Sequence, residues 1–95
     1  MTAERPAPRS GARVELTLRG VDDREARYSA TAAFSGTQAI GDASVSLADG
    51  AVSLSLSPPA PDALHAFVVA VLRRAWASRR EDPAPWPSRI TRWRG

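Results

Sequence analysis

The last eleven residues, Pro85 to Gly95, hold the side chains of this sequence that are best suited to binding chemistry. The segment reads PWPSRITRWRG and interleaves three arginines with two tryptophans. Arginines neutralise phosphates and tryptophans stack on bases, so the composition fits nucleic-acid binding. The alternative is an apolar strip that packs on the protein's own domain while its arginines stay in solvent.

The spacing within this segment separates its two kinds of side chain. Trp86, Ile90 and Trp93 are four and three residues apart, which would align them on one side of a short helical turn capped by Ser88. The arginines would then point elsewhere. Because a nucleic-acid site needs aromatics and arginines on one accessible face, the spacing favours packing of the apolar side chains over nucleic-acid binding.

Groups that could catalyse a reaction are sparse. His65 is the only histidine and cysteine is absent, which excludes disulfides, thiolate ligands and a histidine cluster within one chain. Asp62 precedes His65 by three residues and could join a serine in a triad, but no pattern brings these groups into a cleft. The acidic pairs Asp22–Asp23 and Glu81–Asp82 fall in expected turns. We therefore predict no enzyme, no cofactor and no metal.

The basic charge is concentrated near the carboxyl end. Residues 1–72 carry six arginines against eight acidic residues, whereas residues 73–95 carry seven arginines against two. An anionic partner would meet the carboxyl-terminal part. Because all thirteen basic residues are arginine, we attribute this bias first to a GC-rich bacterial genome, which weakens it as a sign of phosphate binding. The candidates for nucleic-acid binding are Arg73, Arg74, Arg79, Arg80, Arg89, Arg92 and Arg94.

The length of the chain, 95 residues, predicts one small domain with a segment at each end. Residues 1–11 are rich in Pro, Ala and Arg and lack periodicity, which predicts a disordered arm without the apolar stretch of a signal peptide. The longest apolar run, Ala66 to Leu72, is far too short to span a membrane. We predict a cytoplasmic protein with its domain at residues 12–80 and a tail at residues 81–95 docked on a helix.

Alternation of apolar and polar residues predicts a sheet within this domain. Residues 13–19 and 26–34 alternate clearly, and residues 35–42 contain two glycines and are expected to form a loop. In SVSLADGAVSLSLS, Asp49 and Gly50 indicate a two-residue type I′ turn, in which both residues have positive φ.

That turn sets the expected register of the hairpin. It would pair Leu47 with Val52 and Val45 with Leu54, and it would gather serines on the opposite face. We interpret the serines as a solvated sheet surface rather than as a ligand-binding face.

A helix should follow from about Pro61 to Arg80, because Pro suits a first helical turn and Asp62 suits its positive end. One apolar stripe, expected to cover the sheet, contains Leu64, Phe67, Val68, Val71 and Ala75. A second stripe, about 100° away, contains His65, Val69, Leu72 and Trp76. The second stripe requires a cover, and the candidates are the protein's own tail and a second copy of the chain.

The expected fold class is α+β: a four-stranded antiparallel sheet in ββββα order, with one long carboxyl-terminal helix on one face and an extended Pro/Trp/Arg tail. The predicted function is that of a small non-enzymatic protein-interaction module or assembly subunit, which binds a protein partner or a second copy of itself. The candidate partner-binding residues are Val69, Leu72, Trp76, Trp86, Ile90 and Trp93. Nucleic-acid binding through the Arg/Trp-rich carboxyl-terminal region is the disfavoured alternative, and no membrane partner is expected.

Overall fold

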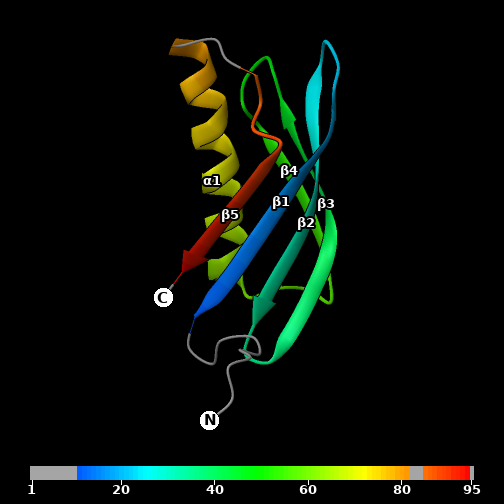
Figure 1. Ribbon diagram of the computed structural model, residues 1–95, viewed down its shortest axis with the longest axis vertical. Coiled ribbons are helices and arrows are strands. Elements are labelled where there is room, and N and C mark those ends of the chain that lie inside the picture. Colours follow the sequence, from blue (N-terminus) through cyan, green and yellow to red (C-terminus); the bar gives the residue numbers. More distant parts are fainter. Residues whose placement is uncertain (1–10, 82–84, 95) are drawn as a thin grey trace.

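The computed structural model describes residues 11–81 and 85–94, so the arm predicted for residues 1–11 lies almost wholly outside the described residues. The elements are β1 (Ala12–Val21), β2 (Glu25–Phe34), β3 (Thr37–Ser46), β4 (Val52–Ser57), α1 (Asp62–Glu81) and β5 (Arg89–Arg94). The sheet is antiparallel in the order β4-β3-β2-β1-β5, and α1 lies across one of its faces (Figure 1). The α+β class is confirmed, but the sheet has five strands rather than four.

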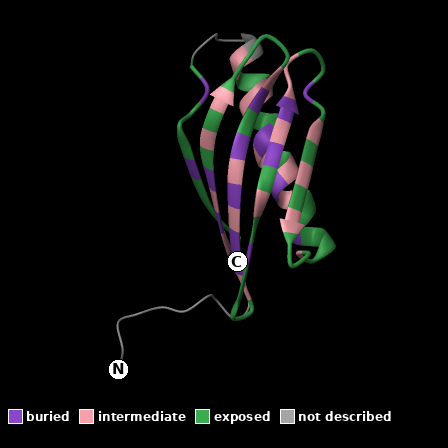
Figure 2. Ribbon diagram, turned by 90° about the vertical axis from the view of Figure 1, so that its right-hand side faces the viewer, coloured by how far each residue is buried: buried purple, intermediate pink, exposed green. Residues whose placement is uncertain are grey.

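The alternation predicted for the first two strands sets which side chains enter the core. Leu16 is fully buried and Tyr28 is 1% exposed, and both belong to the face that α1 covers. Their neighbours along each strand are exposed or half-buried on the other face. Buried and less buried residues therefore alternate along these strands in Figure 2. The core therefore lies between α1 and one face of the sheet, and the other face is open.

Residues 37–42 form the first part of β3, where we expected a loop. Only Ser35 and Gly36 form the turn, and both have positive φ, 48° and 75°. A Cβ atom on Gly41 would overlap the backbone carbonyl oxygen of Ser55 on β4. This glycine permits a close approach of two strands instead of marking a loop.

The β3–β4 hairpin has the predicted faces but not the predicted register. Val45 pairs with Val52 rather than with Leu54, so the strands are displaced by two residues. Because side chains alternate with a period of two, this displacement leaves apolar side chains on one face and serines on the other.

The turn of this hairpin is longer than a type I′ turn. The Ser46 N–H donates to the Ala51 carbonyl oxygen, and the Gly50 N–H donates to the Ser46 carbonyl oxygen. Gly50 has a φ of 76°, but Asp49 is not among the described residues with positive φ, so the predicted turn type is wrong. The Asp49 carboxylate accepts a hydrogen bond from the Ala51 N–H (3.0 Å), which lowers the pKa of that carboxyl group.

Helix α1 begins and ends within one residue of the predicted bounds, but its buried line runs between the two expected stripes. Leu64, Val68 and Leu72 are 3%, 1% and 0% exposed and face the sheet. The α1 backbone approaches β4 and β3 most closely. Leu72, assigned to the second stripe, is therefore a core residue rather than part of a surface that needs a separate cover.

Trp76, also of the second stripe, is covered by the loop between β3 and β4. Its Nε1 donates to the Leu47 carbonyl oxygen (3.0 Å). Its ring lies so close to Gly50 that a Cβ atom there would be 2.5 Å from the indole. The two covers expected from the sequence, the tail and a second copy, did not include this loop.

Residues 89–94 form β5 beside β1, so the predicted helical turn with Trp86, Ile90 and Trp93 on one side is wrong. Ile90 pairs with the core residue Leu16, whereas Trp93 pairs with Arg13 on the opposite face of the sheet. The cause is a long-range one: β1 presents backbone donors and acceptors that need partners, and the tail supplies them.

Candidate protein-interaction site

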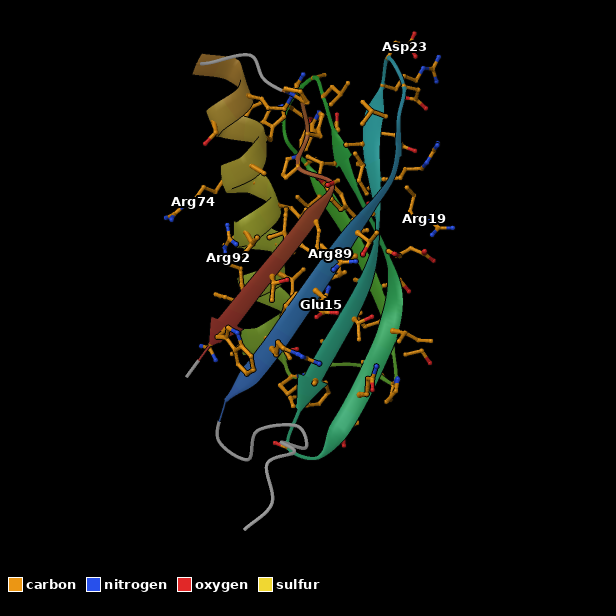
Figure 3. The ribbon with its side chains drawn as sticks, in the orientation of Figure 1. Glu15, Arg19, Asp23, Arg74, Arg89 and Arg92 are labelled. Atoms are coloured by element: carbon orange, nitrogen blue, oxygen red, sulfur yellow. The ribbon has the colours of Figure 1, made fainter. Side chains whose placement is uncertain are left out.

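A groove of about 930 Å³ runs between α1 and β5. We name it the α1–β5 groove. The described residues that line it are Phe67, Ala70, Val71, Arg74, Ala75, Ser78 and Arg79 of α1, together with Pro85, Pro87, Arg89, Ile90, Arg92 and Trp93. Figure 3 shows Arg92 between α1 and β5, and Arg74 extending from α1 towards solvent.

The apolar part of the groove comes mainly from one side of the helix. Phe67, Val71 and Ala75 follow one another at intervals of four residues, so they form a continuous strip on α1. All three are half-buried against the core, and Ile90 beneath them is 4% exposed. The strip is therefore held in place by the core while one side stays accessible.

The charge of the groove has one sign among its described lining residues. Arg74, Arg79, Arg89 and Arg92 line it, and none of its described lining residues is acidic. At one end, the Arg94 guanidinium lies 5.9 Å from the centre of the Phe67 ring. Arginines concentrated along a partly apolar wall attract an anionic ligand more strongly than arginines spread over an open surface.

Tyr28 and Trp86 anchor the segment that leads into β5. The Tyr28 hydroxyl donates to the Pro87 carbonyl oxygen (2.7 Å), and burial raises the pKa of Tyr28 to about 12. The Trp86 ring meets Tyr28 edge to face at 6.3 Å, with the Arg79 guanidinium 5.2 Å from its centre. Within the described residues, the buried Trp86 Nε1 has no hydrogen-bond partner, so Trp86 acts through its volume.

The outer edge of β5 has no neighbouring strand among the described residues. Its sequence, RITRWR, contains three arginines and no acidic residue. Charged side chains on an edge strand oppose pairing with a like-charged strand. The opposite edge of the sheet is β4, whose sequence, VSLSLS, carries no charge.

The structure does not bring the six predicted partner-binding residues onto one surface. Leu72 and Trp86 are core residues, and Val69 and Trp76 are half-buried on the side of α1 that faces β4. Of the six, only Ile90 and Trp93 line the α1–β5 groove, and Trp93 is 67% exposed.

Among the groove residues that sequence reasoning did not assign to a binding site are Phe67, Val71 and Ala75. We assigned all three to the stripe that covers the sheet, because nothing local in the sequence shows that β5 lies beside them.

Four of the seven nucleic-acid candidates lie together in the groove, although they come from segments far apart in the sequence. They are Arg74, Arg79, Arg89 and Arg92. Arg73 is exposed on α1 outside the groove, and its charge contributes to the lowered pKa of Asp49. The Arg80 side chain lies outside the described residues.

A second, smaller hollow of about 480 Å³ lies on the open face of the sheet. Its lining includes Ser44, Ser53, Ser55, Arg19, Arg27 and Asp42. The Arg27 guanidinium already lies 3.5 Å from the Asp22 carboxylate and 3.9 Å from the Glu25 carboxylate. The hollow contains the acidic residue Asp42, and its Arg27 is already paired with two carboxylates. The serine face is therefore a less favourable site for an anionic ligand than the α1–β5 groove.

His65 is exposed at the amino-terminal end of α1, with Nε2 3.4 Å from the Leu54 carbonyl oxygen. In the described part of the chain, no three His, Asp or Glu residues are grouped to hold a metal ion. The described helix is not long and apolar enough to cross a membrane. Comparison of the chain with protein-family models, with curated proteins and with solved structures found no match.

Proposed function

We propose that this protein is a non-enzymatic protein-interaction module and that a segment of a partner protein binds in the α1–β5 groove. The observation that carries the proposal is the make-up of the groove: a half-buried apolar strip of Phe67, Val71 and Ala75, bordered by arginines. Protein interfaces combine an apolar centre with a polar rim, and arginine and tryptophan are among the side chains enriched in them.

Affinity purification from cells that express the protein naturally tests this proposal, with Arg74→Glu against Arg73→Glu as matched variants. Both reverse one exposed charge on α1, but only Arg74 lines the groove. We expect mass spectrometry to detect a partner protein with the wild type and with Arg73→Glu but not with Arg74→Glu. Nuclease treatment should not remove this partner. An identical set of partners with both variants would contradict binding in the groove.

The proposal includes self-association, and charge selects the edge that a second copy would use. Pairing of two β5 strands would bring the three arginines of each copy together, which is unfavourable. The uncharged β4 edge carries no such penalty. A charge placed there, as in Ser55→Arg, should therefore convert a dimer into monomers in sedimentation experiments, while Thr91→Arg on β5 should not. Ser55 pairs with Asp42, so this variant should still fold.

Nucleic-acid binding is the second candidate, because the fold gathers four arginines in one groove. Against it, Trp86 is buried, and Trp93 is the single tryptophan on the exposed surface of the described residues. If the four arginines contacted phosphates, log affinity should fall with log salt at a slope of about −3. We expect no binding of single- or double-stranded oligonucleotides at micromolar protein in fluorescence anisotropy, and a slope of that size would favour this candidate instead.

A further inference from the structure

We infer that the partner segment is extended and acidic and that it adds to β5 as a sixth strand of the sheet. This inference rests on the proposed function, since it names the class of segment that occupies the α1–β5 groove. It is carried by three features of the described residues: the backbone groups on the free edge of β5, the charge of β5, and the apolar strip beside it.

Within the described residues, the free edge of β5 presents backbone groups that bond to no neighbouring strand. In an antiparallel pair, residues alternate between those that bond to the neighbouring strand and those directed away from it. The Leu18 N–H donates to the Ser88 carbonyl oxygen (2.9 Å), so Ile90 and Arg92, at the same parity as Ser88, bond to β1. The backbone groups of the alternate residues Arg89, Thr91 and Trp93 are directed to the free edge.

One hydrogen bond agrees with this assignment. The Thr91 carbonyl oxygen accepts a hydrogen bond from the Arg92 guanidinium (2.9 Å), not from β1. An exposed arginine thus covers a carbonyl group that an incoming strand could use. A carboxylate on that strand would draw the guanidinium away and free the carbonyl oxygen for a backbone N–H donor.

The charge of β5 determines which strand can be added. Its three arginines disfavour a basic strand and a second β5, whereas an acidic residue opposite Arg89, which pairs with Thr17 and so lies on the open face, forms a favourable cross-strand pair. Apolar residues on the groove side of the same strand would contact Phe67 and Val71. Because β5 has six residues, a segment of six to eight residues that alternates acidic and apolar side chains matches its length.

A helical segment fits this edge less well than a strand. A helix satisfies its own backbone groups and offers none to the free N–H and C=O groups of β5. Covering those groups without bonding to them would remove them from water at a cost in affinity. Strand addition satisfies the groups and covers the apolar strip at the same time.

The test uses the full chain and four synthetic eight-residue peptides. The first alternates Glu and Val, and the second alternates Lys and Val. The third and fourth are the Glu/Val peptide with N-methyl groups on alternate residues, so that the N–H groups of one edge are removed in the third and those of the other edge in the fourth. We expect the Glu/Val peptide to bind, with NMR shift changes at Thr91 and Val71. The Lys/Val peptide should not bind, and N-methylation on the edge that faces β5 should weaken binding roughly tenfold or more, whereas the opposite edge should tolerate it.

Matched protein variants test the same contact from the other side. Thr91→Pro removes a free-edge donor without touching the bonds to β1, and Thr91→Ala removes the side chain but keeps that donor. We expect Thr91→Pro to lower the affinity for the Glu/Val peptide about tenfold and Thr91→Ala to change it less than about twofold. Thermal melting checks that each variant is folded. If Thr91→Pro is not folded, the N-methylated peptides still test whether backbone hydrogen bonds to β5 are needed for binding.

The outcomes separate this inference from the proposed function. If the Glu/Val peptide binds in the groove but neither N-methylation nor Thr91→Pro weakens it, strand addition is wrong and groove binding stands. If no peptide binds while Arg74→Glu still loses a protein partner in cells, the segment is of another class and the inference fails alone. If oligonucleotides shift the same NMR signals and the peptides do not, both proposals fail.

Discussion

On its β4 side, α1 is closed by the protein's own loop, whereas on its β5 side it borders an open groove. Trp76 fills the space above Gly50 and donates to the Leu47 carbonyl oxygen. On the other side, Phe67 and Val71 stay half-buried, and the nearest strand comes from the far end of the sequence. The loop between β3 and β4 is close to α1 in the sequence and packs directly on it, whereas β5 pairs with the far edge of the sheet and leaves a groove beside the helix.

The two edges of the sheet differ in the same sense. The β4 edge carries serines and no charge, and the β5 edge carries arginines. On β5 the arginines oppose pairing with a second copy and favour an acidic strand, so one feature can exclude one partner and select another. The β4 side is therefore the structural side of α1, and the β5 side is the side we propose for recognition.

Replacement of Trp86, which anchors the β5 side, should have the largest effect on the stability of the protein. Trp86 is 6% exposed and packs on Tyr28, so Trp86→Ala should lower the free energy of unfolding by about 3–5 kcal/mol. Trp93 is 67% exposed, and Trp93→Ala should cost about 0.5 kcal/mol or less. Urea denaturation of the two variants measures both values. Similar losses would mean that the two tryptophans share one role, as the sequence alone suggested.

The next effect tests the closure of the β4 side. Gly50 and Gly36 both have positive φ, 76° and 75°, but only a side chain at Gly50 would meet Trp76. Gly50→Val should lower the free energy of unfolding by roughly 2–4 kcal/mol, because backbone strain adds to overlap with the indole. Gly36→Val carries the strain alone and should cost about 1–3 kcal/mol. Equal losses in thermal melting would show that Trp76 does not rest on the loop.

Local patterns predicted most of what forms locally. The alternation around Leu16 and Tyr28 identified the core face of β1 and β2, and the sequence after Pro61 placed α1 within one residue at each end. In the β3–β4 hairpin the faces were right although the register was displaced, because a two-residue displacement preserves the alternation. The turn itself was misassigned because Asp49-Gly50 is also compatible with a longer loop, and contact with Trp76 favours that loop.

The groove could not be predicted, because it depends on a contact between distant segments. Ile90 is the single apolar residue of β5 on its core face, so the strand has almost no alternation, and the spacing of Trp86, Ile90 and Trp93 suits a helical turn instead. Pairing with β1 outweighs that local preference. Gly41 was misinterpreted for a similar reason, since the approach of Ser55 is not visible from β3 alone.

Alkali should weaken the β5 side by a smaller amount, because Tyr28 anchors the segment that leads into β5. The pKa of Tyr28 is raised to about 12 by burial, so the neutral phenol is the form that the fold favours. Its contribution to stability is complete below about pH 10, the pKa of an unfolded tyrosine, and is lost as the pH rises towards 12. Tyr28→Phe should lower the free energy of unfolding by about 1 kcal/mol at neutral pH, through loss of the bond to the Pro87 carbonyl oxygen.

The chain suits this measurement, because it contains one tyrosine, no lysine and no cysteine. Ultraviolet absorbance of the phenolate therefore reports Tyr28 alone. The wild type should lose stability between about pH 10 and 12, and Tyr28→Phe should lose less. A phenolate that forms near pH 10 in the folded protein would show that Tyr28 is in contact with solvent and does not anchor the tail.

Acid should weaken the loop on the β4 side through Asp49, and this is the least of the changes that we expect. The hydrogen bond from the Ala51 N–H lowers the pKa of Asp49 below its usual 3.8, and a hydrogen bond with the Ser46 side chain lowers it further. The ionised carboxylate thus favours the folded loop. Its contribution to stability is complete above about pH 4 and is lost as the pH falls through the lowered pKa.

Fluorine NMR of protein labelled with 5-fluorotryptophan can follow both sides of α1 in one spectrum. In acid the Trp76 signal should change before the Trp86 signal, and Asp49→Ala should show the altered Trp76 signal already at neutral pH. In alkali the order should reverse, because Trp86 lies on Tyr28. If both signals changed together in acid and in alkali, the two sides of α1 would open as one unit, and the distinction between a structural side and a recognition side would fail.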